Sequence, residues 1–361
     1  MDFALSEDQV LFQDAISGFL ADQAPLETVR RIAEGDAAAA TGLRAGLADL
    51  GIDQILIPEA HGGLGLGLLD AALVAEALGA AVTPVDFIAN ALGALALSLA
   101  GSDAQQSALL PAMAAGEVRF AVALAEAMGV RADAGVTERD DGLNGRSLFV
   151  QGLPGATHIL VVDRSGALHL VERTASGLDH GPLATIDRTR THATLTYSAT
   201  PSQRLDGCAE PVAVVDLVVE AGHVLLAADT LGAAQAMLDK AVAYARDRKQ
   251  FNRVIGSFQA VKHLCAEMAA EIEPARALVW HAAYARQAGL EDAPLLACLA
   301  KSHLSETGTF VARTATEIHG GMGFTDLVGL HYWFKRIGAN RQLLGGPERV
   351  REKAARLQGW G

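Results

Sequence analysis

The sequence predicts an α+β fold in which a helical domain comes first, a small β domain lies in the middle and a helical bundle closes the chain. Apolar residues recur at helical spacing as far as about Gly116, short β-rich runs occupy about Val118 to Val215, and helical periodicity returns from Asp216 to Arg356. We therefore expect three domains, over residues 1–117, 118–215 and 216–361.

The N-terminal third carries the punctuation of successive helices. Ser6 and Gln9 have the spacing of a capping box, which predicts a helix start. Pro25 and Pro84 predict further helix boundaries, and the glycines of 62–67 predict a loop.

The middle third contains apolar and β-branched runs separated by turn residues. Turns are expected at Gly142, at 152–155 and at 165–166. The runs that predict strands are 120–124, 158–162, 168–171 and 191–197.

The C-terminal third contains the most informative segment. Four cationic side chains gather within eight residues, near the C-terminal end of an amphipathic helix, and they are Arg246, Arg248, Lys249 and Arg253. Gly256 predicts a break, Ser257 a new helix cap, and a second long helix begins at Gln259. Further breaks are expected at 289–294 and 320–329. Such a cluster on its own is typical of a solvated face, and it is also suited to hold an anion.

Bulk properties exclude several classes of function. The chain has 361 residues, 50% hydrophobic composition and a net charge of −13, which argues against binding nucleic acid or anionic membranes. Cys208, Cys265 and Cys298 lie far apart, so neither a disulfide framework nor a zinc site is expected. The start of the chain lacks the features of a signal peptide and the apolar runs are short, which predicts a cytoplasmic protein without a membrane span.

Three segments resemble signatures of the acyl-CoA dehydrogenase family. They occur in the family's order and at similar separations: Ile57-Pro-Glu-Ala-His-Gly-Gly-Leu-Gly, Tyr244-Ala-Arg-Asp-Arg-Lys-Gln-Phe-Asn-Arg, and Glu317-Ile-His-Gly-Gly-Met-Gly-Phe. They span about three quarters of the chain. The glycines of these segments do not have the spacing of a Rossmann fingerprint, so a Rossmann fold is not supported.

The resemblance implies the family's fold and an FAD cofactor. In the family the basic segment reaches across a subunit interface, where an Arg grips the diphosphate of FAD and a Phe packs on the cofactor. These roles fall on Arg248, Gln250 and Phe251. The glycine turn approaches the same diphosphate, which implies cofactor contacts for Glu317, Gly320 and Gly321.

The sequence departs from the family at three places. Glu317 stands where a Gln is usual, which removes an amide donor. The loop that normally holds the flavin ring is replaced by residues 125–133, which keep Glu126 but lose the proline and hydroxyls. The catalytic carboxylate falls either on 343–346 (Leu-Leu-Gly-Gly) or on Gly222, and neither position is acidic.

Substitutes for the missing base can be named. Glu220 lies two residues from Gly222, which is a rotation of about 200° on a helix, so its side chain is expected to point away from the Gly222 position. Glu126 is the other candidate. His223, His319 and His331 are unassigned, with packing or surface roles expected. Three arginines of the C-terminal region are expected on a solvated helix face: Arg336, Arg341 and Arg349. The alternative is that they contact phosphate or acidic residues of a partner.

The retained cofactor corner and the absent base together resemble the accessory chain of a heteromeric acyl-CoA dehydrogenase. The implied partner is a related subunit in an α2β2 assembly, with no assigned catalytic residue or metal in this chain. The Leu-Leu-Gly-Gly segment resembles that of paired bacterial dehydrogenases acting on steroid side-chain CoA thioesters, which implies an acyl-CoA substrate of steroid origin. Two alternatives stay open: a self-sufficient homo-oligomeric dehydrogenase with an atypical base, and a non-catalytic binding or scaffold protein of the same fold.

Overall fold

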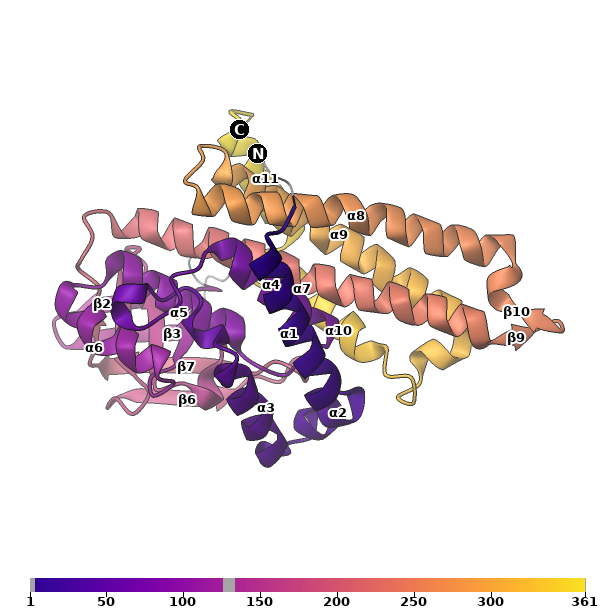
Figure 1. Cartoon of the computed structure of the whole chain (residues 1–361). Helices are drawn as coiled ribbons and strands as arrows, with labels where there is room; N and C mark the ends of the chain where they lie inside the picture. Colours follow the sequence, from indigo (N-terminus) through magenta and orange to yellow (C-terminus); the bar gives the residue numbers. More distant parts are fainter. Residues whose placement is uncertain (1–3, 126–133, 361) are drawn as a thin grey trace. The chain divides into compact units, whose positions relative to one another are not determined.

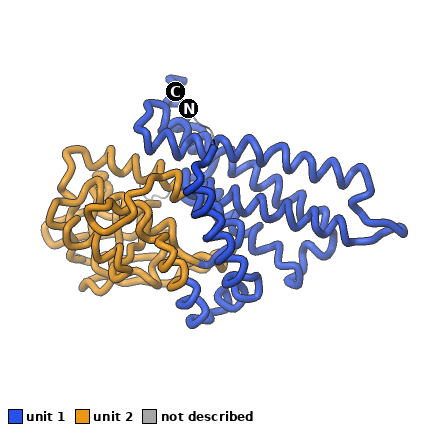
Figure 2. Tube along the Cα trace, in the orientation of Figure 1, with its two compact units in different colours: residues 1–43, 72–84, 223–361 blue, residues 44–71, 85–222 orange. Residues whose placement is uncertain are grey.

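The computed structural model describes residues 4–125 and 134–360. These form two compact units, drawn in different colours in Figure 2. Unit 1 contains Met1–Leu43, Ala72–Pro84 and His223–Gly361, and unit 2 contains Arg44–Ala71 and Val85–Gly222. The expected order of helices, strands and helices along the chain is confirmed (Figure 1). The domain boundaries after residues 117 and 215 stay predictions.

Unit 1 is built from helices. The capping box at Ser6 is present: its hydroxyl accepts from the backbone N–H of Gln9, and the Gln9 side chain accepts from the backbone N–H of Ser6. The helices that lie wholly or partly in unit 1 are α1 (Glu7–Gln23), α2 (Leu26–Ala33), α3 (Ala37–Asp49), α4 (Leu68–Ala80), α7 (Pro211–Asp247), α8 (Gln259–Gln287), α9 (Ala293–His319), α10 (His331–Gln342) and α11 (Pro347–Leu357).

Helices α4 and α7 cross at very close range. A Cβ atom on Gly79 would overlap the carbonyl group of Asp229, and one on Gly232 would overlap that of Glu76. Only glycine lets two helix backbones approach so closely, so these two positions determine where the helices meet.

Buried charges surround this crossing. Glu76 on α4 pairs with Arg276 on α8, and Trp280 donates its ring N–H to the other carboxylate oxygen at 3.2 Å. Burial raises the pKa of Glu76, which the Arg276 charge opposes. Arg336 and Asn340 on α10 form a second such group around Asp229 of α7, with contacts of 3.1 and 2.6 Å to its carboxylate. Because a charge is costly to bury unpaired, these groups fix the neighbouring helices to the crossing.

Unit 2 contains an eight-stranded sheet with the order β6-β7-β3-β1-β4-β5-β8, and β2 pairs with β3. Its only parallel pair among the described strands is β1 with β4. The strands are β1 (Phe120–Ala123), β2 (Gly135–Arg139), β3 (Gly142–Gln151), β4 (His158–Val162), β5 (Leu168–Glu172), β6 (Leu178–Pro182), β7 (His192–Thr200) and β8 (Gln203–Arg204).

Two α-helices of the described residues lie wholly in unit 2: α5 (Phe87–Ala100) and α6 (Asp103–Ala114). Helix α5 packs tightly on β1, because a Cβ atom on Gly93 would overlap the side chain of Phe120. The backbone N–H of Phe120 donates to the Asn90 side chain at 3.0 Å, which in turn donates to Asp53 at 2.9 Å. The sheet's own core is apolar and includes Val136, Val150, Ile159, Val161, Val171 and Leu195.

The structure corrects several local predictions. Ser257 does not cap α8: its hydroxyl donates to the Val254 carbonyl, and Phe258 takes the cap position without a side-chain hydrogen bond. Strands β2, β3 and β6 were not expected. Arg336 is 1% exposed, so its assignment to a solvated face is wrong. It pairs with Asp229, which lies 107 residues away in the sequence, and local sequence patterns do not predict contacts over such a separation.

Helix α7 is long and apolar enough to cross a membrane by length and composition, the only such helix of the described residues. Of its most apolar 18-residue window, 72% is buried inside the protein. This is the burial expected of a core helix.

We expect Gly79→Ala and Gly232→Ala to lower the free energy of unfolding by about 1–3 kcal/mol or more, because each added methyl overlaps a backbone carbonyl. The matched control is Gly18→Ala in α1, where an added methyl meets no atom within 4 Å. That change should raise stability by about 0.5–1 kcal/mol, through helix propensity alone. Chemical denaturation measures the free energy of unfolding of all three variants. Equal effects at the three glycines would contradict the close crossing of α4 and α7.

Candidate functional site

The basic segment, residues 246–253, forms the end of α7 and most of a β-hairpin whose turn has two residues. The backbone N–H of Arg248 donates to the Tyr244 carbonyl at 2.8 Å, which is the last bond of the helix. Strands β9 (Lys249–Gln250) and β10 (Arg253–Val254) then pair antiparallel. Phe251 and Asn252 at the tip both have positive φ, of 51° and 63°, as type I′ hairpin turns require. The expected turn between two helices is therefore a hairpin, and Figure 1 shows it projecting beyond the helix ends.

The hairpin presents charge and an aromatic ring to solvent. Phe251 is 87% exposed. The cations of this segment are also exposed, and none of them forms an ion pair within the described chain: Arg246, Arg248, Lys249 and Arg253. The Arg253 guanidinium lies 3.9 Å from the centre of the Phe258 ring, which orients it. The segment is an available anion-binding surface.

The glycine turn, η6 (Gly320–Phe324), follows α9 and contains two kinds of glycine. A Cβ atom on Gly323 would lie 2.6 Å from the Thr316 carbonyl oxygen, so the protein's own packing requires that glycine. Gly320 and Gly321 face open space, with no atom within 4 Å of an added Cβ. Gly320 needs its freedom for a φ of 56°, whereas Gly321 has no such need. Its lack of a side chain suits the close approach of something outside the chain.

The structure brings these two segments together. The rings of Tyr244, in the last turns of α7, and His319, at the end of α9, are stacked with centroids 4.4 Å apart. All six predicted cofactor residues therefore lie on the two segments joined by this stack. Glu317 is exposed in the last turn of α9 and adds a negative charge there. The exposed cations, the open glycines and the exposed Phe251 fit a flavin dinucleotide's diphosphate and rings.

One of the two positions where a catalytic carboxylate was expected, the 343–346 segment, contacts the residue that follows the other position. His223 follows Gly222 directly, and its ring Nε2–H donates to the Leu344 carbonyl at 2.8 Å. Leu343 and Leu344 are both buried, and Leu344 adopts a φ of 54°. Burial lowers the pKa of His223 to about 3, so its ring is neutral and a poor proton acceptor. This corner is filled by two leucines and an uncharged imidazole.

A buried lysine holds the same segment. Lys301 on α9 is 2% exposed and donates from Nζ to the carbonyls of Arg341 and Gly345, at 3.1 and 3.2 Å. Burial, with the nearby Arg341 charge, lowers the pKa of Lys301 to about 7. Lys301 and His223 thus fix residues 343–346 through backbone carbonyls.

The remaining candidates are placed as follows. Glu220 is buried in α7, at 4% exposure. Glu126, with the rest of 126–133, lies outside the described residues. His331 contacts Asp326 at 3.5 Å, and Arg341 pairs with Glu306 at 2.8 Å.

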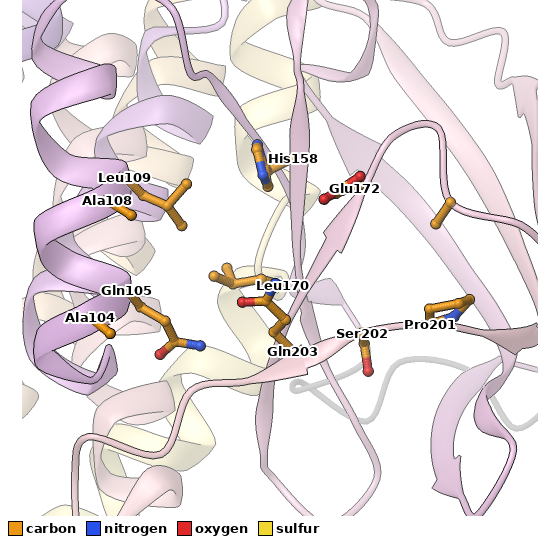
Figure 3. A pocket seen from close by; sticks show the side chains of 11 residues that line it. Ala104, Gln105, Ala108, Leu109, His158, Leu170, Glu172, Pro201, Ser202 and Gln203 are labelled. Carbon is orange, nitrogen blue, oxygen red and sulfur yellow. The ribbon is translucent and has the colours of Figure 1, made fainter.

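Unit 2 holds a cavity of about 550 Å³ between α6 and strands β4, β5 and β8 (Figure 3). Its polar lining consists of Gln105, His158, Glu172, Ser202 and Gln203. The Gln105 amide is already engaged at both ends, with the N–H of Ser102 and the carbonyl of Arg204. Ser202 contacts the ring of His169. None of the six predicted cofactor residues, which all belong to unit 1, lines this cavity.

A cluster of acids and a histidine also lies in unit 2. Side-chain atoms of Glu138, Asp163 and His169 lie within 4.8 Å of one another. Asp163 accepts from Ser165 and contacts His169 at 3.3 Å, while Arg204 pairs with Glu138 at 3.7 Å. Because the Arg204 guanidinium already supplies positive charge here, part of the cluster's negative charge is balanced within the chain.

Comparison with known families agrees with the geometry. Residues 6–117 match the acyl-CoA dehydrogenase N-terminal domain, and residues 213–357 match the acyl-CoA dehydrogenase C-terminal domain. The match to the second covers both the hairpin and the glycine turn.

Individual relatives align over nearly the whole chain. The acyl-CoA dehydrogenase IpdE2 of Mycobacterium tuberculosis is 31% identical over 347 residues, which is 95% of each chain. A variant of the Tcur3481-Tcur3483 steroid ACAD has a TM-score of 0.88 and 30% identity, covering 98% of both chains. The ChsE4-ChsE5 complex of Mycobacterium tuberculosis contains a chain with a TM-score of 0.90 and 26% identity, with full coverage of both.

The lowered pKa of Lys301 predicts a pH-dependent stability. Between pH 7 and about 10.5 the unfolded chain carries a proton on this lysine that the folded chain releases, so the folded state gains stability as the pH rises through that window. We expect the unfolding free energy of the natural protein, relative to Lys301→Met, to increase from pH 7 to 10. Lys262→Met, on the exposed side of α8, is the control and should give a flat difference. A flat difference for Lys301→Met as well would contradict the prediction.

Proposed function

Because the chain belongs to the acyl-CoA dehydrogenase family, we propose that it is the accessory subunit of a heteromeric FAD-dependent acyl-CoA dehydrogenase. In this assembly a related partner chain carries the catalytic base and the acyl pocket. This chain contributes the corner that grips the FAD diphosphate. The reaction is the α,β-desaturation of an acyl-CoA thioester, for which bound FAD accepts the hydride.

One observation carries the proposal: the diphosphate corner is open and charged, while the base corner of the same chain is closed. Arg248 is exposed and unpaired within the described chain, and Gly321 faces open space. By contrast, Leu344 is buried and held by His223, a neutral ring. A chain with this combination can complete a cofactor site but has no carboxylate on the 343–346 segment to abstract a proton.

Each residue of the corner has a task that suits its chemistry. The planar Arg248 fork donates paired, charge-assisted hydrogen bonds to phosphate oxygens. The backbone N–H of Gly321 donates from a surface that no side chain blocks, while the N–H of Gly320 already donates to the Glu317 carbonyl at the end of α9. Phe251 and Gln250 on the hairpin offer an apolar face and an amide to the rest of the cofactor.

The partner and substrate are proposed from the relatives. Two of the solved structures that resemble this chain are named as assemblies, ChsE4-ChsE5 and Tcur3481-Tcur3483, and the second is a steroid ACAD. We propose an α2β2 heterotetramer with a related subunit and a steroid-derived acyl-CoA, in the cytoplasm.

A second candidate is a self-sufficient homo-oligomeric dehydrogenase. The observation in its favour is the burial of Glu220, because a buried carboxylate is the kind of group that serves as a base. Turnover by the purified single chain that is lost in Glu220→Gln would establish this candidate in place of the first.

We expect the chain purified alone to hold little flavin and to show no turnover, and the complex purified with its native partner to hold FAD. In that complex Arg248→Ala should weaken FAD binding about ten- to a hundredfold, the loss expected when a charged hydrogen bond is removed. Arg356→Ala, which removes an exposed arginine of α11, is the matched control and should have no effect. Flavin absorbance and fluorescence titration measure both. Unchanged binding in Arg248→Ala would instead favour a scaffold protein that does not handle flavin.

The two kinds of glycine in η6 should separate stability from cofactor binding. Gly323→Ala should lower the melting temperature of the chain, because its methyl group meets the Thr316 carbonyl oxygen. Gly321→Ala should leave that temperature unchanged and weaken FAD binding by the complex. The reverse pattern would show that Gly321 serves the fold and not the cofactor.

A further inference from the structure

An aromatic stack connects the two halves of the diphosphate corner. The rings of Tyr244 and His319 lie 4.4 Å apart at an interplanar angle of 25°. Tyr244 belongs to the last turns of α7, and His319 is the last residue of α9, 75 positions later in the sequence. The contact is therefore one of tertiary structure and does not arise within either helix.

Each ring is joined by the backbone to a residue that contacts the anion in the proposed function. The Tyr244 carbonyl accepts the N–H of Arg248 at 2.8 Å. On the other side, His319 immediately precedes Gly320 and Gly321 in sequence. A shift of one ring against the other thus changes the separation between Arg248 and the backbone N–H of Gly321.

The His319 ring is held in one orientation. Its Nδ1–H donates to the Ala315 carbonyl at 2.7 Å, which fixes the tautomer with the proton on Nδ1. Burial lowers the pKa of His319, the Ala315 carbonyl opposes that shift, and the charge of Lys240 adds to it. The ring is consequently a neutral, flat surface on which Tyr244 rests.

We propose that Tyr244 and His319 are a positioning pair, whose stacked rings set the spacing between Arg248 and the Gly320-Gly321 turn so that both grip one diphosphate. This inference rests on the proposed function. Neither ring needs to touch the cofactor. Their effect is exerted through the two segments they join, because hydrogen bonds from two separate segments to one anion require both to be placed within about 0.5 Å.

The pair is distinguishable from ordinary packing. Packing alone would make Tyr244 important for stability and irrelevant to FAD affinity once the complex has assembled. Positioning makes the ring, and not its hydroxyl, important for affinity. It also makes the two residues act as one unit, so that removing the second adds little after the first is gone.

The test uses the complex purified with its native partner and measures the Kd of FAD by flavin fluorescence, together with the melting temperature without FAD. Tyr244→Phe keeps the ring and should bind FAD like the natural protein. Tyr244→Leu and His319→Gln should each raise the Kd about tenfold, and the Gln amide can still donate to Ala315. The double variant should be no weaker than either single one. Tyr284→Leu, which truncates a partly exposed tyrosine of α8, is the matched control and should leave the Kd unchanged.

The outcomes separate the two proposals when Arg248→Ala is run in the same assay. An unchanged Kd in both Tyr244→Leu and His319→Gln, beside a raised Kd in Arg248→Ala, would overturn the positioning pair and leave the accessory function intact. Additive losses in the double variant, or an equal loss in Tyr244→Phe, would also overturn it. An unchanged Kd in Arg248→Ala would overturn the proposed function itself. Because His319→Gln keeps the backbone hydrogen bond, the test stands even if Tyr244→Leu does not fold.

Discussion

The close crossing of α4 and α7 is the constraint on which the helical unit depends. Gly79 and Gly232 allow the two backbones to meet where any side chain would overlap a carbonyl group. At that distance the carboxylates beside the crossing are shut off from water, and each needs a cation from another helix. Arg276 on α8 and Arg336 on α10 supply those cations. The absence of two Cβ atoms thereby determines how four helices are placed.

Helix α7 contacts the 343–346 segment and leads into the basic hairpin, at well-separated points. His223 holds the closed base segment, and Arg248 follows the helix's last turn at the diphosphate corner. The 25 residues between them correspond to about 37 Å of helix. The crossing at Gly232 lies between the two. The middle of this helix is buried, so the base segment and the hairpin segment contact opposite ends of one packed element.

The sequence predicts the class of fold better than its contacts. Helical and alternating periodicity identified the three regions in order, together with the capping box at Ser6. Strand β3 is not predicted by the sequence, because Gly142–Gln151 mixes glycines with polar residues and does not alternate regularly. In the structure this irregularity corresponds to register shifts against β7. The role of Gly79 could not be predicted, since a glycine in a helical pattern signals only low propensity. Arg336 was misassigned because its partner lies on another helix. The residues of the diphosphate corner were found through their resemblance to a family signature, while the ring stack beneath them required the structure.

The charge of the diphosphate corner bears on the replacement of the family's usual Gln by Glu317. An exposed carboxylate repels phosphate, but water screens that repulsion to about 1 kcal/mol at 4 Å. Against it stand the four exposed cations of the hairpin segment, with only Asp247 as a further acid among its eight residues. The corner therefore stays positive in a chain whose net charge is −13. Arg246, Arg248 and Lys249 form no ion pair within the described chain, and Gly321 faces open space, so this combination is consistent with the anion site proposed above.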